Sequence, residues 1–320
     1  MLTTTLFIAG FAALIKGADF LVDGASSVAR RYRIPPIVIG LTIVAFGTSM
    51  PELFVNVFAA LNGTADIAVG NIVGSNIVNI LLILGVSALV ARLTVSSDTV
   101  WKEIPMGLLA VVVLGAVAND ILLGSATENV LTRGDGIVLI GFFIIFLYYT
   151  VGLALRQRNN SPGENTVPEQ SMLRSVLFIG TGLAGLIVGG KWIVDGATTI
   201  AAMWGLSEAM IGLTIVAVGT SLPELATSAV AAYKGNTDIA IGNVAGSNIF
   251  NIFWLLGISA IIAPLPYNLT LNFDLMVVAV ASFLLFAAIF VHHRGTLGKV
   301  EGISFIVLYI LYLIAVVARG

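Results

Sequence analysis

Residues 40–80 read GLTIVAFGTSMPELFVNVFAALNGTADIAVGNIVGSNIVNI, and residues 212–252 read GLTIVAVGTSLPELATSAVAAYKGNTDIAIGNVAGSNIFNI. At a constant offset of 172 residues, 26 of these 41 positions are identical. Self-similarity at one fixed offset indicates an internal duplication. The identities concentrate on polar, Gly and Pro positions, whereas packing alone would mainly preserve apolar volume. The repeated polar positions are therefore the first candidates for a functional role.

The composition of the chain is that of a polytopic membrane protein. Of 320 residues, 58% are hydrophobic and 10% are charged, and the mean hydropathy is +1.04. A soluble domain is charged at about a quarter of its positions, so a soluble enzyme is excluded. The lack of Cys excludes a disulfide framework and a thiolate metal site. A net charge of −2 is too small to indicate a nucleic-acid partner, and we expect no cofactor and no protein partner.

Ten apolar runs are long enough to cross a bilayer, which takes about 20 residues per helix. The runs lie at about 3–28, 37–60, 67–91, 104–122, 136–155, 173–200, 209–232, 239–262, 275–291 and 302–318. The expected fold class is therefore an all-α polytopic membrane protein with ten transmembrane helices.

The ten helices are expected to form two repeats. A polar stretch with two prolines, residues 156–171, predicts a flexible cytoplasmic linker between a first five-helix repeat at 1–155 and a second at 172–320. Because five is odd, the second copy must enter the membrane upside down relative to the first. Such inverted repeats are typical of secondary transporters, whose substrate site lies near the midplane between the repeats.

The distribution of basic residues predicts the orientation. The loops after the odd-numbered spans share one side of the membrane. They carry eleven of the 15 Lys and Arg residues, namely Arg30, Arg31, Arg33, Arg92, Lys102, Arg156, Arg158, Arg174, Lys234, Arg294 and Lys299. By the positive-inside rule this side is cytoplasmic, so both termini are expected outside the cytoplasm.

The first repeated motif is GTSMPE at 47–52 and GTSLPE at 219–224. Proline lacks an N–H and disfavours helix in the residue before it, so a helix should break near Ser49 and restart with Pro51 in its first turn. Glu52 then projects from the restarted helix. The break should free the carbonyl groups of Ala45, Phe46 and Gly47. At membrane depth, free carbonyl groups are stable only where they line a cavity or bind a ligand such as a cation.

The second repeated motif is GNIVGSNIVN at 70–79 and GNVAGSNIFN at 242–251. Its Gly-x-x-x-Gly part is also explained by close helix packing, which does not account for the polar residues. Ser75 and Asn79 are four residues apart and share a helix face. Ser247 and Asn251 have the same spacing in the second copy, and in both copies the glycines would let another backbone approach.

The collected ligand groups are all oxygens: two carboxylates from Glu52 and Glu224, hydroxyls, amide oxygens and carbonyls. This set suits Ca²⁺, and Na⁺ by extension, and suits transition metals poorly. Two ionised glutamates in one apolar site would repel each other. One divalent cation would neutralise both charges. Monovalent ions or protons would neutralise them in the alternative state, and this mutual exclusion is a physical basis for exchange. The alternative is that the glutamates pair with Lys16 or Lys191.

At these two motifs the chain resembles the cation/Ca²⁺ exchanger superfamily, specifically the compact prokaryotic Na⁺/Ca²⁺ exchangers. The resemblance implies two inverted five-helix repeats with a cation site formed by spans 2, 3, 7 and 8. Asn occupies both positions where some family members carry Asp, which leaves two carboxylates in the site. The ligands that the resemblance implies are the side chains of Glu52, Glu224, Ser49, Ser221, Thr48, Thr220, Ser75, Ser247, Asn79 and Asn251 and the carbonyls of Ala45 and Ala217.

The expected function is an antiporter that exchanges Ca²⁺ for Na⁺ by alternating access, with the Na⁺ gradient driving Ca²⁺ out of a prokaryotic cell across its inner membrane. One alternative is an H⁺/Ca²⁺ antiporter that uses the same glutamates, although the GN-x-x-E-type motif usual in that branch is absent. Another is a cation channel, because paired broken helices also occur in channels. An enzyme is not expected, because no nucleophile, His partner or catalytic metal set accompanies the glutamates.

Overall fold

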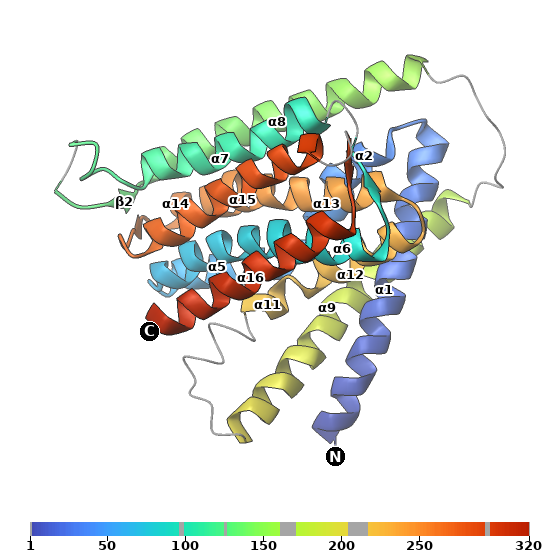
Figure 1. Cartoon of the computed structure of the whole chain (residues 1–320), viewed down its shortest axis with the longest axis horizontal. Coiled ribbons are helices and arrows are strands. Elements are labelled where there is room, and N and C mark those ends of the chain that lie inside the picture. Colours follow the sequence, from blue (N-terminus) through green and yellow to red (C-terminus); the bar gives the residue numbers. More distant parts are fainter. Residues whose placement is uncertain are drawn as a thin grey trace.

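A computed structural model describes residues 2–95, 99–124, 127–160, 171–203, 217–291 and 295–319. The described chain is almost entirely helical (Figure 1). Through β2 the elements are α1 (Leu2–Tyr32), α2 (Pro36–Ile39), η1 (Gly40–Val44), α3 (Ala45–Thr48), α4 (Met50–Leu61), α5 (Ala65–Ile77), η2 (Val78–Ile83), α6 (Leu84–Val90), β1 (Leu93–Thr94), η3 (Thr99–Glu103), α7 (Ile104–Val117) and β2 (Val130–Leu131), where η marks a π-helical segment.

The remaining described elements begin with α8 (Arg133–Asn160) and end with α16 (Lys299–Arg319). Between them lie α9 (Met172–Met203), α11 (Ala217–Thr220), α12 (Leu222–Tyr233), α13 (Thr237–Ile249), η5 (Phe250–Leu256), α14 (Gly257–Ile262), β3 (Leu265–Pro266), α15 (Leu271–Val291) and β4 (Thr296–Leu297). The predicted linker at 156–171 lies mostly outside the described residues.

Seven described helices are long and apolar enough to cross a membrane. Two of them, at 65–90 and 237–262, each continue through a π-helical segment. An eighth candidate is the bent pair Pro36–Thr48 and Met50–Leu61. Of the other two predicted runs, 104–122 contains α7, which has 14 residues, and 209–232 lies partly outside the described residues. The chain is therefore a polytopic helical membrane protein.

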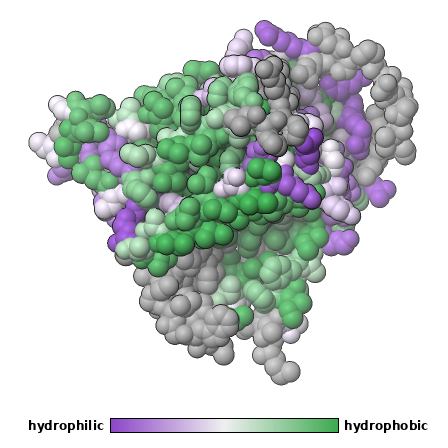
Figure 2. Space-filling model, viewed as in Figure 1, coloured by the Kyte–Doolittle hydropathy of each residue, from purple (hydrophilic) through white to green (hydrophobic). Residues whose placement is uncertain are grey.

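The molecular surface agrees with a membrane environment. Figure 2 shows hydrophobic side chains over a broad area of the displayed face, with hydrophilic residues gathered toward its edges. Large apolar side chains such as Ile137, Ile144 and Phe283 are exposed. An apolar surface of this extent is stable against lipid and unfavourable in water.

Helices α1 and α9 form an antiparallel pair that runs at a steep angle to the other long helices (Figure 1). Glycines let the two backbones approach closely. A Cβ atom on Gly17 would lie 2.8 Å from the carbonyl oxygen of Gly182, which leaves no room for a side chain there. Small residues at helix contacts are typical of membrane proteins, where close packing contributes much of the association energy.

Two short antiparallel strand pairs lie at the two ends of α7. Strand β1 pairs with β4, and β2 pairs with β3. Each pair joins a loop of the first half of the chain to a loop of the second half. The prediction of an all-helical chain did not include these pairs, because strands of two residues carry no hydrophobic periodicity.

Candidate cation-binding site

The predicted helix break is present in both copies of the first motif. Ser49 separates α3 from α4 with φ −82° and ψ 10°, and Ser221 separates α11 from α12 with φ −88° and ψ 6°. Pro51 and Pro223 each lie in the first turn of the helix that follows. The axis turns by 49° at Ser49. Both glutamates of the motif therefore lie in a first helical turn next to a break.

The prediction that the break frees the carbonyl of Ala45 is wrong, because this oxygen accepts the backbone N–H of Ser49 at 3.0 Å; its role as a ligand stays a prediction. At the break, Pro51 has no N–H to offer the carbonyl of Gly47, two residues after Ala45. In the second copy the N–H of Ser221 bonds to the carbonyl of Val218 at 3.2 Å.

The serine of each break contacts the glutamate of the other half. Ser49 Oγ donates to Glu224 Oε1 at 2.9 Å, and Ser221 Oγ donates to Glu52 Oε1 at 3.2 Å. Ser49 Oγ also lies 3.1 Å from Ser247 Oγ on α13. These crossed pairs bring the two copies of the first motif into one buried polar cluster.

Both glutamates are 1% exposed. Among the described residues, neither forms an ion pair with Lys16 or Lys191, and Lys16 lies 3.9 Å from Asp19 instead. The predicted alternative of a buried glutamate–lysine pair is therefore not seen. A buried carboxylate without a counter-charge is costly, so a site with two of them is suited to bind positive charge.

The second motif also forms crossed contacts, here between asparagine amides. Asn79 Nδ2 donates to Asn248 Oδ1 at 2.9 Å, and Asn251 Nδ2 donates to Asn76 Oδ1, also at 2.9 Å. Asn76 Nδ2 further donates to the carbonyl of Asn248 at 3.3 Å. Asn79 and Asn251 lie in π-helical segments, η2 and η5, which often occur at functional positions.

The other predicted ligands lie as follows. Ser75 and Ser247 are buried, and Thr48 Oγ1 lies 3.0 Å from the carbonyl of Val44 and 3.1 Å from Asn243 Oδ1. Ala217 begins α11. Five oxygens of the predicted ligands are buried and have no hydrogen-bond partner among the described residues: Glu52 Oε2, Glu224 Oε2, Ser75 Oγ, Asn79 Oδ1 and Asn251 Oδ1. Oxygens with a free lone pair are what a hard cation requires.

A cavity of about 600 Å³ reaches the first copy of the second motif. Gly70, Asn71 and Gly74 line it on α5, together with Thr220 from the second helix break. Arg319 and Asp274 lie on its wall and form an ion pair of 2.8 Å. The cavity gives one of the predicted ligands, Thr220, a connection to open space.

Three polar residues of the cluster were not predicted as part of the site. Asn76 and Asn248 contact the predicted amide ligands, and Asn243 contacts Thr48 and, through Nδ2, Ser228 at 3.0 Å. Their repetition at the 172-residue offset was a usable signal. Sequence alone did not reveal that Thr48, Asn79 and Asn251 contact them from the opposite half.

The chain matches the family described as sodium/calcium exchanger protein over residues 2–152 and 174–318. It is 42% identical over 272 residues to inner membrane protein YrbG of Escherichia coli, covering 82% of this chain and 81% of that protein. It is 31% identical over 342 residues to sodium/calcium exchanger MaX1 of Methanosarcina acetivorans, covering 97% of each. A solved structure of the sodium-calcium exchanger NCX_Mj matches with a TM-score of 0.82 and 34% identity, covering 98% of both chains.

These comparisons are with membrane transporters and not with enzymes, in agreement with the prediction from the sequence. The family match accounts for both halves of the chain, and the structural match extends over nearly all of it. The chain belongs to the sodium/calcium exchanger protein family.

Proposed function

We propose that the chain is an antiporter that exchanges Ca²⁺ for Na⁺ by alternating access, with the Na⁺ gradient driving Ca²⁺ out of the cell. The observation that carries this proposal is the pair of buried glutamates, each hydrogen-bonded to the break serine of the other half. No basic side chain among the described residues pairs with either carboxylate. The cation would supply the missing positive charge.

The charge of the site supports exchange. With Asn at positions 79 and 251, two carboxylates remain, and one Ca²⁺ ion neutralises both. The hydroxyls, amide oxygens and carbonyls predicted as ligands would complete the six to eight oxygens that Ca²⁺ usually takes. Na⁺ ions entering from the other side would neutralise the same carboxylates, so Ca²⁺ and Na⁺ would compete for one site.

The architecture we propose is two inverted repeats of five helices, at 1–155 and 172–320, with the linker 156–171 in the cytoplasm and both termini outside. The two stretches that match the family, 2–152 and 174–318, support this division. The chain has no Cys, so Gly163→Cys and Gly320→Cys would each introduce a unique label site. A membrane-impermeant maleimide applied to intact cells should label position 320 and not position 163; the reverse pattern would contradict the orientation.

Flux of ⁴⁵Ca²⁺ into proteoliposomes tests the function directly. Uptake should require Na⁺ inside, saturate with external Ca²⁺ and persist when the pH gradient is collapsed. Uptake that follows an imposed pH gradient and ignores Na⁺ would favour the H⁺/Ca²⁺ antiporter. Uptake that needs no counter-ion on the far side would favour a channel.

A further inference from the structure

We infer that Asn76 and Asn248 are positioning residues, which fix the amide orientation of Asn251 and Asn79 so that their oxygens face the cation. This inference rests on the proposed function. The two contacts cross between the halves and have the same length, 2.9 Å, from Nδ2 of one asparagine to Oδ1 of the other. Position 248 is 172 residues from position 76, and position 251 is 172 residues from position 79.

The two ends of an asparagine amide interact differently with a cation. The oxygen end accepts and can bind a cation, whereas the NH₂ end donates and repels one. Rotation by half a turn about the last side-chain bond exchanges the two ends. An asparagine ligand therefore needs a second contact that decides which end faces the ion.

Asn248 supplies that contact for Asn79. Its Oδ1 accepts the Asn79 Nδ2, which leaves the Asn79 Oδ1 buried and without a partner among the described residues. Asn76 acts in the same way on Asn251, whose Oδ1 is likewise buried and unpartnered. A reversed amide would place two oxygens in contact at each pair, so the observed orientation is the favourable one.

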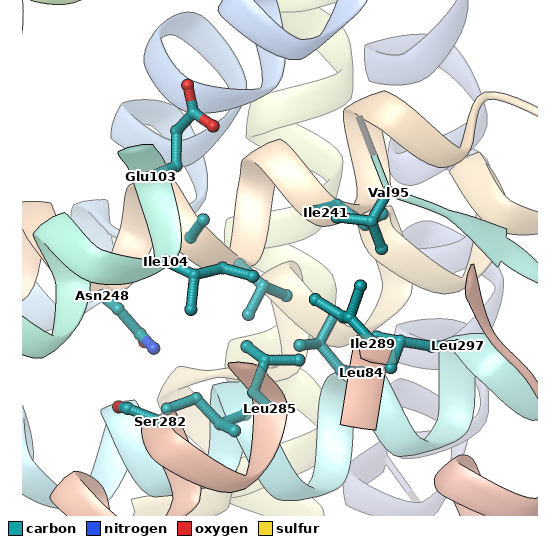
Figure 3. Close-up of a pocket in the computed structure, with 13 residues that line it drawn as sticks. Leu84, Val95, Glu103, Ile104, Ile241, Asn248, Ser282, Leu285, Ile289 and Leu297 are labelled. Atoms are coloured by element: carbon teal, nitrogen blue, oxygen red, sulfur yellow. The ribbon is translucent and has the colours of Figure 1, made fainter. Parts of the chain in front are cut away.

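The surroundings of Asn248 offer its side chain little competition. Asn248 lies at the edge of a small cavity of about 30 Å³ (Figure 3), whose other lining residues are mostly apolar, such as Ile104 and Leu285. The Ser282 hydroxyl at this cavity bonds to the carbonyl of Val278 in its own helix, at 2.8 Å. The Ser282 hydroxyl therefore does not donate to the Asn248 oxygen, which accepts the Asn79 amide.

The variant Asn248→Ala removes the acceptor and leaves the Asn79 amide free to reverse. We expect the KM for Ca²⁺ to rise roughly tenfold, the size of the loss of about one buried hydrogen bond, with smaller change in the maximal rate. Asn248→Asp keeps an acceptor at the same position and should restore most of the Ca²⁺ affinity. The control is Ser259→Ala, because the hydrogen bond of Ser259 Oγ among the described residues stays within its own helix, to Leu255 at 2.8 Å, and this variant should transport like the wild type.

A double-mutant cycle separates positioning from a general structural role. In the Asn79→Ala background there is no amide left to orient, so adding Asn248→Ala should change KM little further. Asn76→Ala and Asn251→Ala form the matching cycle in the other half. Losses that multiply in both double mutants would overturn the inference, as would a wild-type KM in Asn248→Ala.

The wild type distinguishes this inference from the function on which it rests. If the wild-type protein shows no Na⁺-dependent Ca²⁺ flux, the proposed function fails. If it does and the cycles are multiplicative, only the positioning role fails. If Asn248→Ala does not yield folded protein, Asn248→Asp provides the test. A KM of Asn248→Asp as high as that of Asn79→Ala would contradict the inference, because the acceptor would be present without supporting Ca²⁺ binding.

Discussion

Ser49 and Glu224 are 175 positions apart in the chain, yet the serine hydroxyl lies 2.9 Å from the carboxylate. Its counterpart, Ser221 with Glu52, makes the same contact at 3.2 Å. We expect Ser49→Ala and Ser221→Ala each to raise the KM for Ca²⁺ by about tenfold or more, because each removes one hydrogen bond to a charged group. Flux against Ca²⁺ concentration measures this, with Ser304→Ala on the exposed face of α16 as control. A change in only one of the two would contradict the equivalence of the halves.

The two glutamates themselves should be indispensable. Glu52→Gln and Glu224→Gln keep the size of the side chain and remove its charge, so each should abolish Ca²⁺ transport while the protein stays folded and monodisperse. Size-exclusion chromatography and ⁴⁵Ca²⁺ flux check the two parts of this prediction. Wild-type flux in either variant would exclude that carboxylate as a Ca²⁺ ligand.

The backbone packs closely at Gly246, which predicts that a larger residue there lowers the stability of the protein. Gly74, at the equivalent position of the first half, provides the control. A Cβ atom on Gly246 would lie 2.8 Å from the Leu41 carbonyl and from the Ala45 Cβ, whereas its counterpart Gly74 has no described atom within 4 Å. Gly246→Ala should therefore destabilise the protein by about 1–3 kcal/mol through overpacking. Gly74→Ala should leave the melting temperature in detergent nearly unchanged or raise it. Equal effects on the melting temperature would show that the contact with Leu41 is not rigid.

Lys234 ties the loop between α12 and α13 to α1. Its Nζ lies 2.7 Å from Asp23 Oδ1 and 2.5 Å from Asp19 Oδ1. Burial lowers the pKa of Lys234, but the hydrogen bonds to Asp19 and Asp23 outweigh this effect and raise the pKa above its ordinary value.

The raised pKa of Lys234 determines how the folding stability changes with pH. The stabilisation from Lys234 is fully present below the pKa of an unfolded lysine and is lost as the pH rises through the folded value. Lys234→Met should lower stability by no more than about 1 kcal/mol, because the pair is partly exposed. The difference in melting temperature between wild type and variant should stay constant from about pH 6 to 9 and shrink at higher pH. A difference that vanishes near neutrality would contradict the assignment.

Sequence reasoning succeeded where the covalent chemistry of one residue decides the local structure. Pro51 removes a donor and restricts the residue before it, so the break at Ser49 followed from the motif alone. The repeat likewise indicated which polar residues to group. It did not reveal their partners, because whether Ser49 contacts Glu52 or Glu224 depends on how the two halves pack.

The same limit explains the other differences. That the Ala45 carbonyl accepts the Ser49 N–H depends on where within one turn the helix ends. The π-helical turns that carry Asn79 and Asn251 involve one extra residue per turn, which a period of 3.6 does not reveal. The orientation of each amide is set by a neighbour from the opposite half, so a pattern read along one half contains only one partner of each pair.

The crossed pairs also bear on how such a chain could arise. Ser49–Glu224 and Ser221–Glu52 are one contact made twice between positions that are equivalent at the 172-residue offset. A half-length ancestor that carried both residues would have had no use for this contact by itself. Two copies, associated as a homodimer, would have formed it at once in duplicate. Fusion into one chain then allowed the two sides to diverge, as they have at Lys234, where the first half carries Asn62.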